Sequence, residues 1–398
     1  MKSKNESLQR ILIAVSIAMI IIALIFTMVF ALRREDNGKN IYESSIVDDS
    51  FSTQESFDSS AESLETSDAT SVFDEVTDDS ESGEELPIET FHGWIINDYG
   101  YTYIYDNCGY EQFNYKTTAL NRYVNSINKL AEVLPKDIRM FSIIVPVSST
   151  FVSIPKEIYV ADNFYNQSQS AFVSTVNSKL NERIYTVPVV ELLEAEYDKG
   201  ESVFFKTDKN WTSLGAYHAY STFCQSASLN AYSLESFKKE NIGPFLGSFY
   251  TATELEDMFE HPDDFIVYST LPTVKTALSV IDNGLVYSNY SLCENPVSLT
   301  TGYSCYLGRT AEKYELSSNA DGGALLVIGD SSAYPMIPFL ASHYSKIDII
   351  DPVKCNDQLE SILKTKDYDD CIMICYSTNA VSGEFIPEFN KFLGGIDG

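Results

Sequence analysis

The chain has 398 residues and 44% hydrophobic content, enough for one large globular domain or two ordinary ones. Its formal net charge of −30 argues against nucleic acid as a partner, because an acidic surface repels phosphate backbones. There are four histidines, and the seven cysteines show no zinc-ligand spacing, so the sequence predicts no metal site and no cofactor.

Residues 11–32 form an apolar stretch without a charged side chain, and three basic residues precede it within residues 1–10. A helix of this length spans roughly 33 Å, enough to cross a hydrocarbon core. The stretch is long for a signal peptide and no A-x-A cleavage site follows it, so we expect an uncleaved transmembrane anchor. Basic residues are balanced on its two sides. The simpler topology then leaves the N-terminus in the cytoplasm and the C-terminal domain outside the cell membrane.

Residues 33–90 are rich in Ser, Thr, Asp and Glu, and positions 41–90 hold 16 acidic residues and no Lys or Arg. Such a segment buries too little apolar surface to offset the ordering of its backbone, so we expect a disordered acidic linker. Like charges extend it into a stalk, although phosphorylation or mimicry of an acidic ligand is an alternative role. The remaining residues 91–398, the predicted folded domain, carry 38 acidic and 21 basic residues, a net charge of −17.

Strand and helix signals alternate within the predicted domain. In chain order they predict a helix over 117–134, strand 140–147, helix 167–183, strand 184–190 with a short helix after it, an extended piece over 203–206, a helix from 211, an irregular insertion over 242–300, strand 325–328, helix 333–344, strand 347–350, helix 356–364 and strand 371–376. Short apolar strands separated by helices indicate an α/β domain whose mainly parallel sheet is covered on both faces. Ligands of such sheets bind at the carboxyl ends of the strands, where Ser331 and residues 146–149 lie.

The sequence Gly329-Asp330-Ser331 stands between a buried strand and a helix. The glycine permits a tight turn, and backbone N–H groups at a helix start can stabilise an oxyanion. Ser331 is therefore a candidate nucleophile. A plain helix cap is the alternative, because serine is common at that position.

A serine nucleophile needs a base that a carboxylate orients, and Asp208 is the candidate carboxylate. The base is not evident. Asn210 is an amide, which cannot accept a proton at neutral pH. Lys209 would have to lose its proton, which the adjacent carboxylate opposes. His218 lies about two helical turns after Asn210 and is more simply a packing residue, and Trp211 either packs at the start of the helix or stacks on a sugar.

Two cysteines, Cys293 and Cys305, are separated by a short stretch of chain. They could close a disulfide loop if the domain is extracellular. Two buried thiols that pack as small apolar side chains are the equal alternative.

Six stretches together resemble one family. They are FFKTDKNWTSLGAYHAY (204–220), GPFLGSFYTAT (243–253), HPDDFIVY (261–268), TGYSCYLGRT (301–310), LLVIGDSSA (325–333) and PFLASHYSKIDIIDP (338–352). In these the domain resembles the DHHW family of bacterial membrane-anchored, SGNH-hydrolase-like proteins, which are related to alginate O-acetyltransferase ectodomains. The resemblance covers nearly all of residues 91–398.

The resemblance implies a three-layer α/β/α, flavodoxin-like domain that helps to acetylate exported polysaccharide, often beside a multispanning membrane O-acyltransferase. It places the nucleophile at Ser331, the carboxylate at Asp208 and the base at position 210. This sequence has Lys209 and Asn210 where the family motif has histidines, and Ser332 where it has tyrosine. A further family motif of the Asp-Leu-Arg-Tyr kind is also altered, at positions 351–354. These departures suggest weakened or lost activity.

Three hypotheses follow. The first is a catalytically impaired member that binds an exported polysaccharide or cell-wall glycan, or assists a membrane O-acyltransferase, with Trp211 and Ser332 as candidate substrate-binding residues. The second is an active O-acetyltransferase or carbohydrate esterase that uses Ser331 with a relocated base. The third is an envelope scaffold without a ligand cleft.

Overall fold

The computed structural model describes residues 91–97, 100–293 and 299–395. The chain divides into two units, Met1–Gly83 and Glu84–Gly398, and every described residue belongs to the second. The predicted anchor (11–32) and linker (33–90) therefore lie outside the described residues. Within the described part of the chain, no helix is both long enough and apolar enough to span a bilayer.

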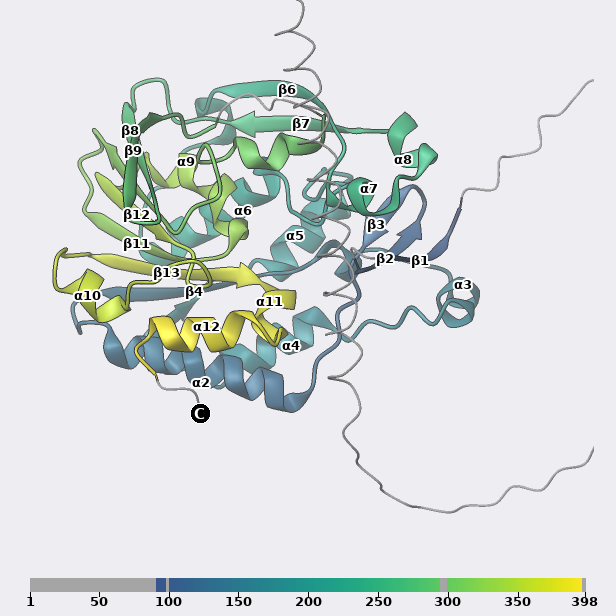
Figure 1. Ribbon diagram of the computed structural model, residues 1–398, viewed down its shortest axis with the longest axis horizontal. Helices are drawn as coiled ribbons and strands as arrows, with labels where there is room; N and C mark the ends of the chain where they lie inside the picture. Colours follow the sequence, from purple (N-terminus) through teal and green to yellow (C-terminus); the bar gives the residue numbers. More distant parts are fainter. Residues whose placement is uncertain (1–90, 98–99, 294–298, 396–398) are drawn as a thin grey trace, which may run out of the picture. The chain divides into compact units, whose positions relative to one another are not determined.

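A large mixed sheet forms the centre of this unit (Figure 1). Among the described residues it has eight strands, in spatial order β5 (Ile184–Thr186), β4 (Arg139–Val145), β13 (Asp370–Tyr376), β11 (Ala324–Gly329), β12 (Lys346–Ile350), β10 (Lys313–Ser318), β8 (Thr276–Asp282) and β9 (Leu285–Tyr290). The first five pair in parallel, whereas β12, β10, β8 and β9 pair antiparallel. The predicted strands over 140–147, 325–328, 347–350 and 371–376 are confirmed as β4, β11, β12 and β13.

The prediction of a mainly parallel sheet is wrong, because the antiparallel β10, β8 and β9 make it mixed. The described residues of the range 242–300, expected to be an irregular insertion, include β8, β9, β7 (Asp263–Tyr268) and part of β6 (Lys239–Phe245), and β6 and β7 form a second antiparallel pair. The β8–β9 hairpin turns at Asn283 and Gly284, which both have positive φ. Its strands are only half buried, so they lack the continuous apolar run that marked the central strands.

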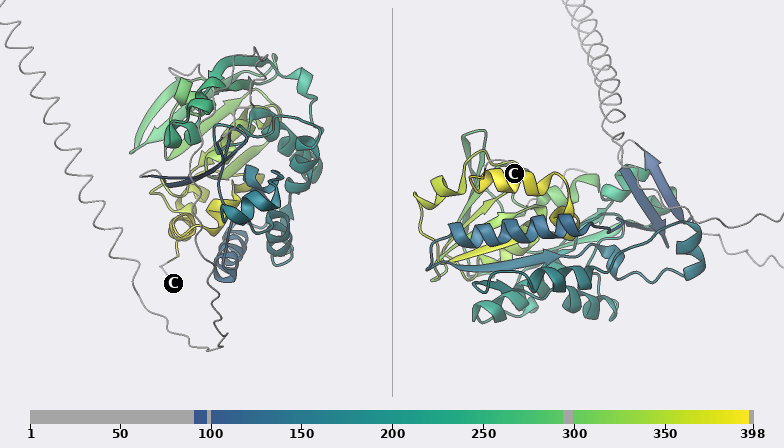
Figure 2. Two further views of the ribbon diagram at one scale, coloured as in Figure 1. Left: turned by 90° about the vertical axis from the view of Figure 1, so that its right-hand side faces the viewer. Right: turned by 90° about the horizontal axis from the view of Figure 1, so that it is seen from below.

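Helices lie on both sides of the sheet (Figure 2). They are α2 (Thr117–Val133), α3 (Lys156–Ala161), α4 (Gln169–Asn177), α5 (Val190–Tyr197), α6 (Ser213–Ala227), α7 (Ser248–Thr253), α8 (Glu256–Glu260), α9 (Ile337–Leu340), α10 (Leu359–Leu363), α11 (Ser377–Val381) and α12 (Phe385–Phe392), with the 3₁₀ turns η1 (Ser148–Thr150), η2 (Leu234–Ser236), η3 (Leu299–Cys305) and η4 (Ser331–Met336). Cys375 of β13 contacts Tyr123 of α2, and Phe141 of β4 packs edge-on against Phe223 of α6. The two helices therefore cover opposite faces.

The predicted helices over 117–134 and from 211 are confirmed as α2 and α6. Apolar residues of α2 recur every three or four positions and are buried, as its amphipathic sequence requires. Thr212 caps α6 by accepting a hydrogen bond from Gly215 N at 3.2 Å. A side chain at Gly215 would meet the Val203 carbonyl oxygen at 2.5 Å, so the glycine lets α6 begin against the 203–206 segment. This contact fixes the loop that precedes α6, which carries Asp208.

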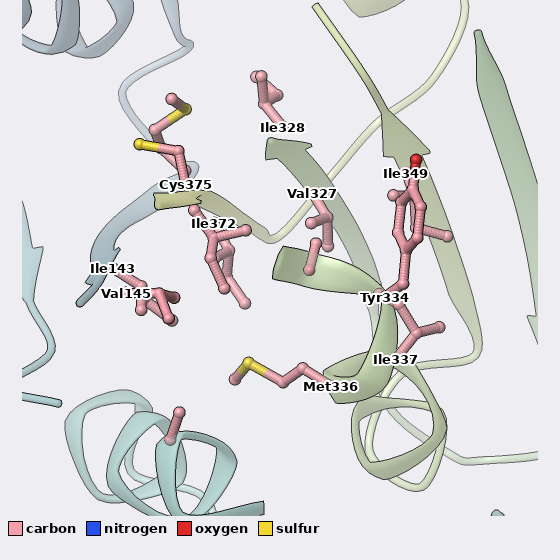
Figure 3. Close-up of a cluster of buried hydrophobic side chains, with 14 of the residues drawn as sticks. Ile143, Val145, Val327, Ile328, Tyr334, Met336, Ile337, Ile349, Ile372 and Cys375 are labelled. Atoms are coloured by element: carbon pink, nitrogen blue, oxygen red, sulfur yellow. The ribbon is translucent and has the colours of Figure 1, made fainter. Parts of the chain in front are cut away.

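Buried hydrophobic side chains pack around the central strands β4, β11, β12 and β13 (Figure 3). Ile328 and Cys375 point to one face of the sheet, whereas Val327 and Ile372 point to the other. All four are buried, and Val327, Ile328 and Ile372 each contribute about 1.5–3 kcal/mol of hydrophobic stabilisation relative to exposure. Met336, on the turn after β11, is also buried in this core and holds that turn against the sheet.

A small antiparallel sheet, β1 (Gly93–Asn97), β2 (Gly100–Tyr105) and β3 (Cys108–Tyr110), precedes α2. Ile104 packs with Phe249 and Met258 of α7 and α8 on one side, and Tyr103 stacks on Phe164 on the other. Gly109 N donates to the Lys206 carbonyl at 2.9 Å. The small sheet is thereby attached to the strand-like segment that leads to Asp208.

Candidate functional site

The predicted site residues gather at the carboxyl ends of β11 and β13. Trp211 joins the two stretches, because its Nε1 donates to the Ser332 carbonyl at 3.0 Å. Its backbone N–H also donates to the hydroxyl of Tyr376, at the end of β13, at 3.2 Å. The Asp208–Trp211 loop and the Ser331 turn are thus held together although about 120 positions separate them in the chain. The Trp211 ring is fully buried, so it packs as a link between the two stretches and has no face open to a sugar.

Asp208 is buried and fully engaged. Its Oδ1 accepts hydrogen bonds from the backbone N–H and the side-chain Nδ2 of Asn210, at 2.8 and 2.6 Å. Its Oδ2 accepts from Ser248 N at 2.7 Å. A side chain at Gly247 would meet Asp208 Cβ at 2.1 Å, so only glycine lets the start of α7 approach this closely. The carboxylate therefore orients the side chain at position 210.

The Asn210 amide can make the hydrogen bonds of a histidine at this position but cannot act as a base. It donates to Asp208, as an imidazole N–H would, and it presents Oδ1 as an acceptor. Oδ1 is buried and has no hydrogen-bond partner among the described residues. An amide oxygen accepts hydrogen bonds but does not take up a proton at neutral pH, so the dyad can bind a hydroxyl group but cannot deprotonate it.

Ser331 follows β11 at the start of η4 and is partly exposed. Its hydroxyl makes no hydrogen bond with any residue that the structure describes, whereas its carbonyl accepts from Tyr303 Oη at 3.4 Å. The next residue, Ser332, is fully buried, and its hydroxyl has no partner in the described part of the chain. The candidate nucleophile is thus accessible and unactivated.

Asp330 holds the Ser331 turn in place. Its Oδ1 accepts from Ser332 N at 2.9 Å, and its Oδ2 accepts from Tyr376 N at 2.9 Å and from Asn379 Nδ2 at 2.6 Å. Burial raises the pKa of the Asp330 carboxyl, and these donors oppose the rise. The N–H of Ser332, which could otherwise face an oxyanion, is occupied. The sequence signal for this role is an aspartate directly before a candidate helix start.

Two further ionisable residues, Tyr303 and Glu111, interact electrostatically with this site. Burial raises the pKa of Tyr303, and nearby Tyr376, Asp208 and Asp330 raise it further. Burial also raises the pKa of Glu111, with like charges on Asp208 and Asp330 adding to the effect and Lys209 opposing it. These shared interactions place both residues within electrostatic range of the two carboxylates. No motif marked them, because they come from η3 and from the segment after β3.

Three of the four histidines make their contacts elsewhere. His343 Nε2 is 2.7 Å from the Tyr220 hydroxyl, and His261 Nδ1 is 2.9 Å from the Asp257 carbonyl. His218 lines a different pocket on α6, where Glu196 and Glu201 are its charged neighbours. Within the described part of the chain, no group of three or more His, Cys, Asp or Glu side chains could hold a metal ion.

Solved structures share this fold at low sequence identity. A DHHW family protein from Eubacterium siraeum aligns with a TM-score of 0.64 and 21% identity, over 75% of this chain and 97% of that one. Bacillus cereus PatB1, solved with a sulfonyl adduct, aligns with a TM-score of 0.58 and 15% identity, over 74% and 99%. The O-acetyltransferase domain of Pseudomonas putida AlgJ is more distant, with a TM-score of 0.39 and 12% identity over 77% and 96%.

The chain has no match among curated protein sequences. The sequence profile described as "DHHW protein" matches residues 34–350, which is most of the chain. The protein therefore belongs to the DHHW family.

Proposed function

We propose that this protein is a membrane-anchored, extracellular member of the polysaccharide O-acetylation type that binds glycan without efficient turnover of its own. It binds an exported polysaccharide or a cell-wall glycan, or it assists a multispanning membrane O-acyltransferase. The observation that carries the proposal is the Asp208–Asn210 hydrogen bond, which keeps the orientation of the family's carboxylate–histidine pair but supplies no base. Membership of the DHHW family and the likeness to the PatB1 fold support the polysaccharide context.

The test is esterase activity of the full-length chain, purified in mild detergent, toward a chromogenic acetyl ester. We expect the unaltered chain and Ser331→Ala to hydrolyse the ester at the same low rate. Asn210→His gives Asp208 an imidazole to orient, and a general base contributes 10²- to 10⁴-fold, so we expect a gain of at least about tenfold. Ser331→Ala in the same chain should abolish the gain.

Lys209→His is the matched control, because it adds a histidine at the adjacent position and keeps the Asn210 amide that Asp208 orients. It should leave the rate unchanged. Rapid turnover by the unaltered chain that Ser331→Ala abolishes would overturn the proposal.

That outcome would favour the second candidate, an active O-acetyltransferase or esterase. The observation on its side is the partly exposed Ser331 hydroxyl with Glu111 in electrostatic range of the same carboxylates. In this mechanism Ser331 Oγ attacks the carbonyl carbon of an acetyl donor and its proton passes to Glu111, which gives it to the donor's ester oxygen as the bond between that oxygen and the acetyl group breaks. A sugar hydroxyl then attacks the acyl-enzyme and passes its proton to Glu111, which returns it to Ser331 Oγ as the acyl bond breaks. Glu111→Gln would abolish such turnover.

A further inference from the structure

An open groove of about 810 Å³ lies between the small N-terminal sheet and the 162–165 segment. Trp94, Ile96, Tyr101 and Tyr165 provide its apolar surface. Tyr101 is 70% exposed, Ile96 is 64% exposed and Tyr165 is 46% exposed. Large apolar side chains gathered in one exposed depression are typical of a binding surface.

The strand register explains why these side chains share one face. Trp94 pairs with Tyr103, and Ile96 pairs with Tyr101, across β1 and β2. Residues two apart in a strand point the same way, so all four lie on one face of the hairpin. Of the inner pair, Tyr103 is covered, because it stacks on Phe164 with ring centroids 4.0 Å apart, whereas Trp94 still lines the groove. The outer pair, Ile96 and Tyr101, is left open to the groove.

Both walls of the groove are fixed by hydrogen bonds. Trp94 Nε1 donates to the Asp162 carbonyl at 2.7 Å, and Tyr103 Oη donates to Asp162 Oδ2 at 2.8 Å. On the opposite wall, Asn114 Nδ2 donates to the Tyr165 carbonyl at 3.0 Å. The groove is therefore formed before any ligand arrives, which lowers the entropy that binding must overcome.

The polar groups of the groove are amides and carboxylates. Glu111 and Gln112 line it, and neither side chain hydrogen-bonds to a residue that the structure describes. No Lys or Arg is among the described residues that line it, and residues 91–398 carry a net charge of −17. Such a surface suits hydroxyl, amide and ammonium groups and repels carboxylates and phosphates.

Glu111 connects the groove to the candidate site. It lines the groove and lies within electrostatic range of Asp208, Asp330 and Lys209. The Gly109–Lys206 hydrogen bond fixes the backbone next to it against the segment that leads to Asp208.

We propose that this groove binds a hexosamine glycan, with sugar rings stacked on Tyr101 and Tyr165 and amino or acetamido groups held by Glu111 and Gln112. The faces of a sugar ring carry C–H groups that pack on aromatic side chains, and its edges carry the polar groups that amides and carboxylates bind. The inference rests on the proposed function, for which it names the glycan class and the place of binding.

Calorimetry on the full-length chain tests this with three oligosaccharides of equal length: an N-acetylglucosamine oligomer, its partly deacetylated form and an oligogalacturonate. We expect the first two to bind and the anionic oligomer not to bind. Tyr101→Ala should weaken both at least tenfold, and Tyr165→Ala should do the same. Glu111→Gln should weaken only the deacetylated oligomer, because that oligomer alone carries ammonium groups. Tyr185→Ala, at a 52% exposed tyrosine on β5, is the control and should change neither affinity.

The outcomes separate the two proposals. If the oligomers bind but Tyr101→Ala and Tyr165→Ala leave their affinities unchanged, the groove assignment is overturned while the proposed function stands. Binding of the deacetylated oligomer alone, insensitive to Tyr101→Ala, would show attraction to the acidic surface and would likewise overturn it. If no glycan binds the unaltered chain, the glycan-binding part of the proposed function fails as well.

Discussion

At the scale of single residues, Asn210 and Glu111 decide what the site can do. A buried acceptor left without a donor costs roughly 1–3 kcal/mol, and Asn210 Oδ1 is such an acceptor among the described residues. The structure tolerates that cost beside the partly exposed Ser331, where an incoming hydroxyl could supply the missing donor. Retaining an oriented, unpaired acceptor fits binding better than it fits catalysis.

The charge of Glu111 predicts a pH dependence of stability. Its pKa is raised from the ordinary value of 4.5, first by burial. The folded chain therefore binds this proton more tightly than the unfolded chain, and stability falls as the pH rises from 4.5 through the raised value. Glu111→Gln should flatten the pH dependence of the unfolding free energy in that window and make the chain more stable than the parent above it.

Urea unfolding at a series of pH values measures this effect. Glu360→Gln is the control of opposite sign, because Lys364 lowers the pKa of the exposed Glu360 carboxyl. An unchanged pH slope in Glu111→Gln would show that this carboxyl ionises alike in the folded and unfolded states.

At the scale of elements, the sequence predicted the central strands, which are buried on both faces, and the amphipathic helix α2. The strands β4, β11, β12 and β13 are mostly apolar and mostly buried, and α2 has a regular apolar stripe. The hairpin β8–β9 and the small sheet β1–β3 went unrecognised, because half-exposed strands mix polar and apolar residues without a clear period. Their pairing depends on partners distant in the chain, which local patterns do not contain.

The turn η3 carries Tyr303 to the carbonyl of Ser331, and its last residue is Cys305. Cys305 Sγ lies 2.9 Å from Cys293 Sγ, less than an ångström beyond the disulfide bond length of about 2.05 Å. Two backbone interactions hold the two segments together. One is an isolated antiparallel β-bridge between Cys293 and Tyr306, and the other is the hydrogen bond from Leu307 N to the Leu292 carbonyl oxygen. In the structure both are free thiols, and they lie close enough that the loss of their two hydrogens would join them.

We therefore predict a Cys293–Cys305 disulfide in protein that has matured outside the cytoplasm. The two thiols lose two protons and two electrons to an acceptor disulfide, which becomes two thiols. Peptide mass spectrometry without reductant should find the linked pair lighter by two hydrogens, with Cys355 alkylated as a free thiol. Reduction should lower stability by about 2–4 kcal/mol and loosen η3. Two alkylated cysteines at 293 and 305 in such protein would refute the prediction.

At the scale of the whole molecule, the site is built from four segments that are distant in the chain, and the sequence alone did not predict that all four meet. Ser331 comes from the parallel half of the sheet, Asp208 from the loop before α6, Tyr303 from η3 and Glu111 from the edge of the small sheet. Motif positions predicted the first two, because their residue types and flanking elements mark them. The other two reach the site only through long-range packing, such as the attachment of β3 to Lys206.

The same unit is strongly acidic, with a net charge of −17 over residues 91–398, and this predicts a salt dependence. Repulsion between like charges destabilises a compact acidic domain. Salt screens this repulsion between charges that are farther apart than the Debye length, about 10 Å at 0.1 M. Salt also weakens exposed ion pairs such as Lys364–Glu360, but each of these contributes only about 0–1 kcal/mol. Because the excess of negative charge is large, repulsion should dominate.

The Tm of the full-length chain should therefore rise between 10 and 500 mM NaCl, measured by calorimetry against sucrose of equal osmolality. A falling Tm would mean that attractive pairs, and not the net charge, govern the electrostatics of the fold.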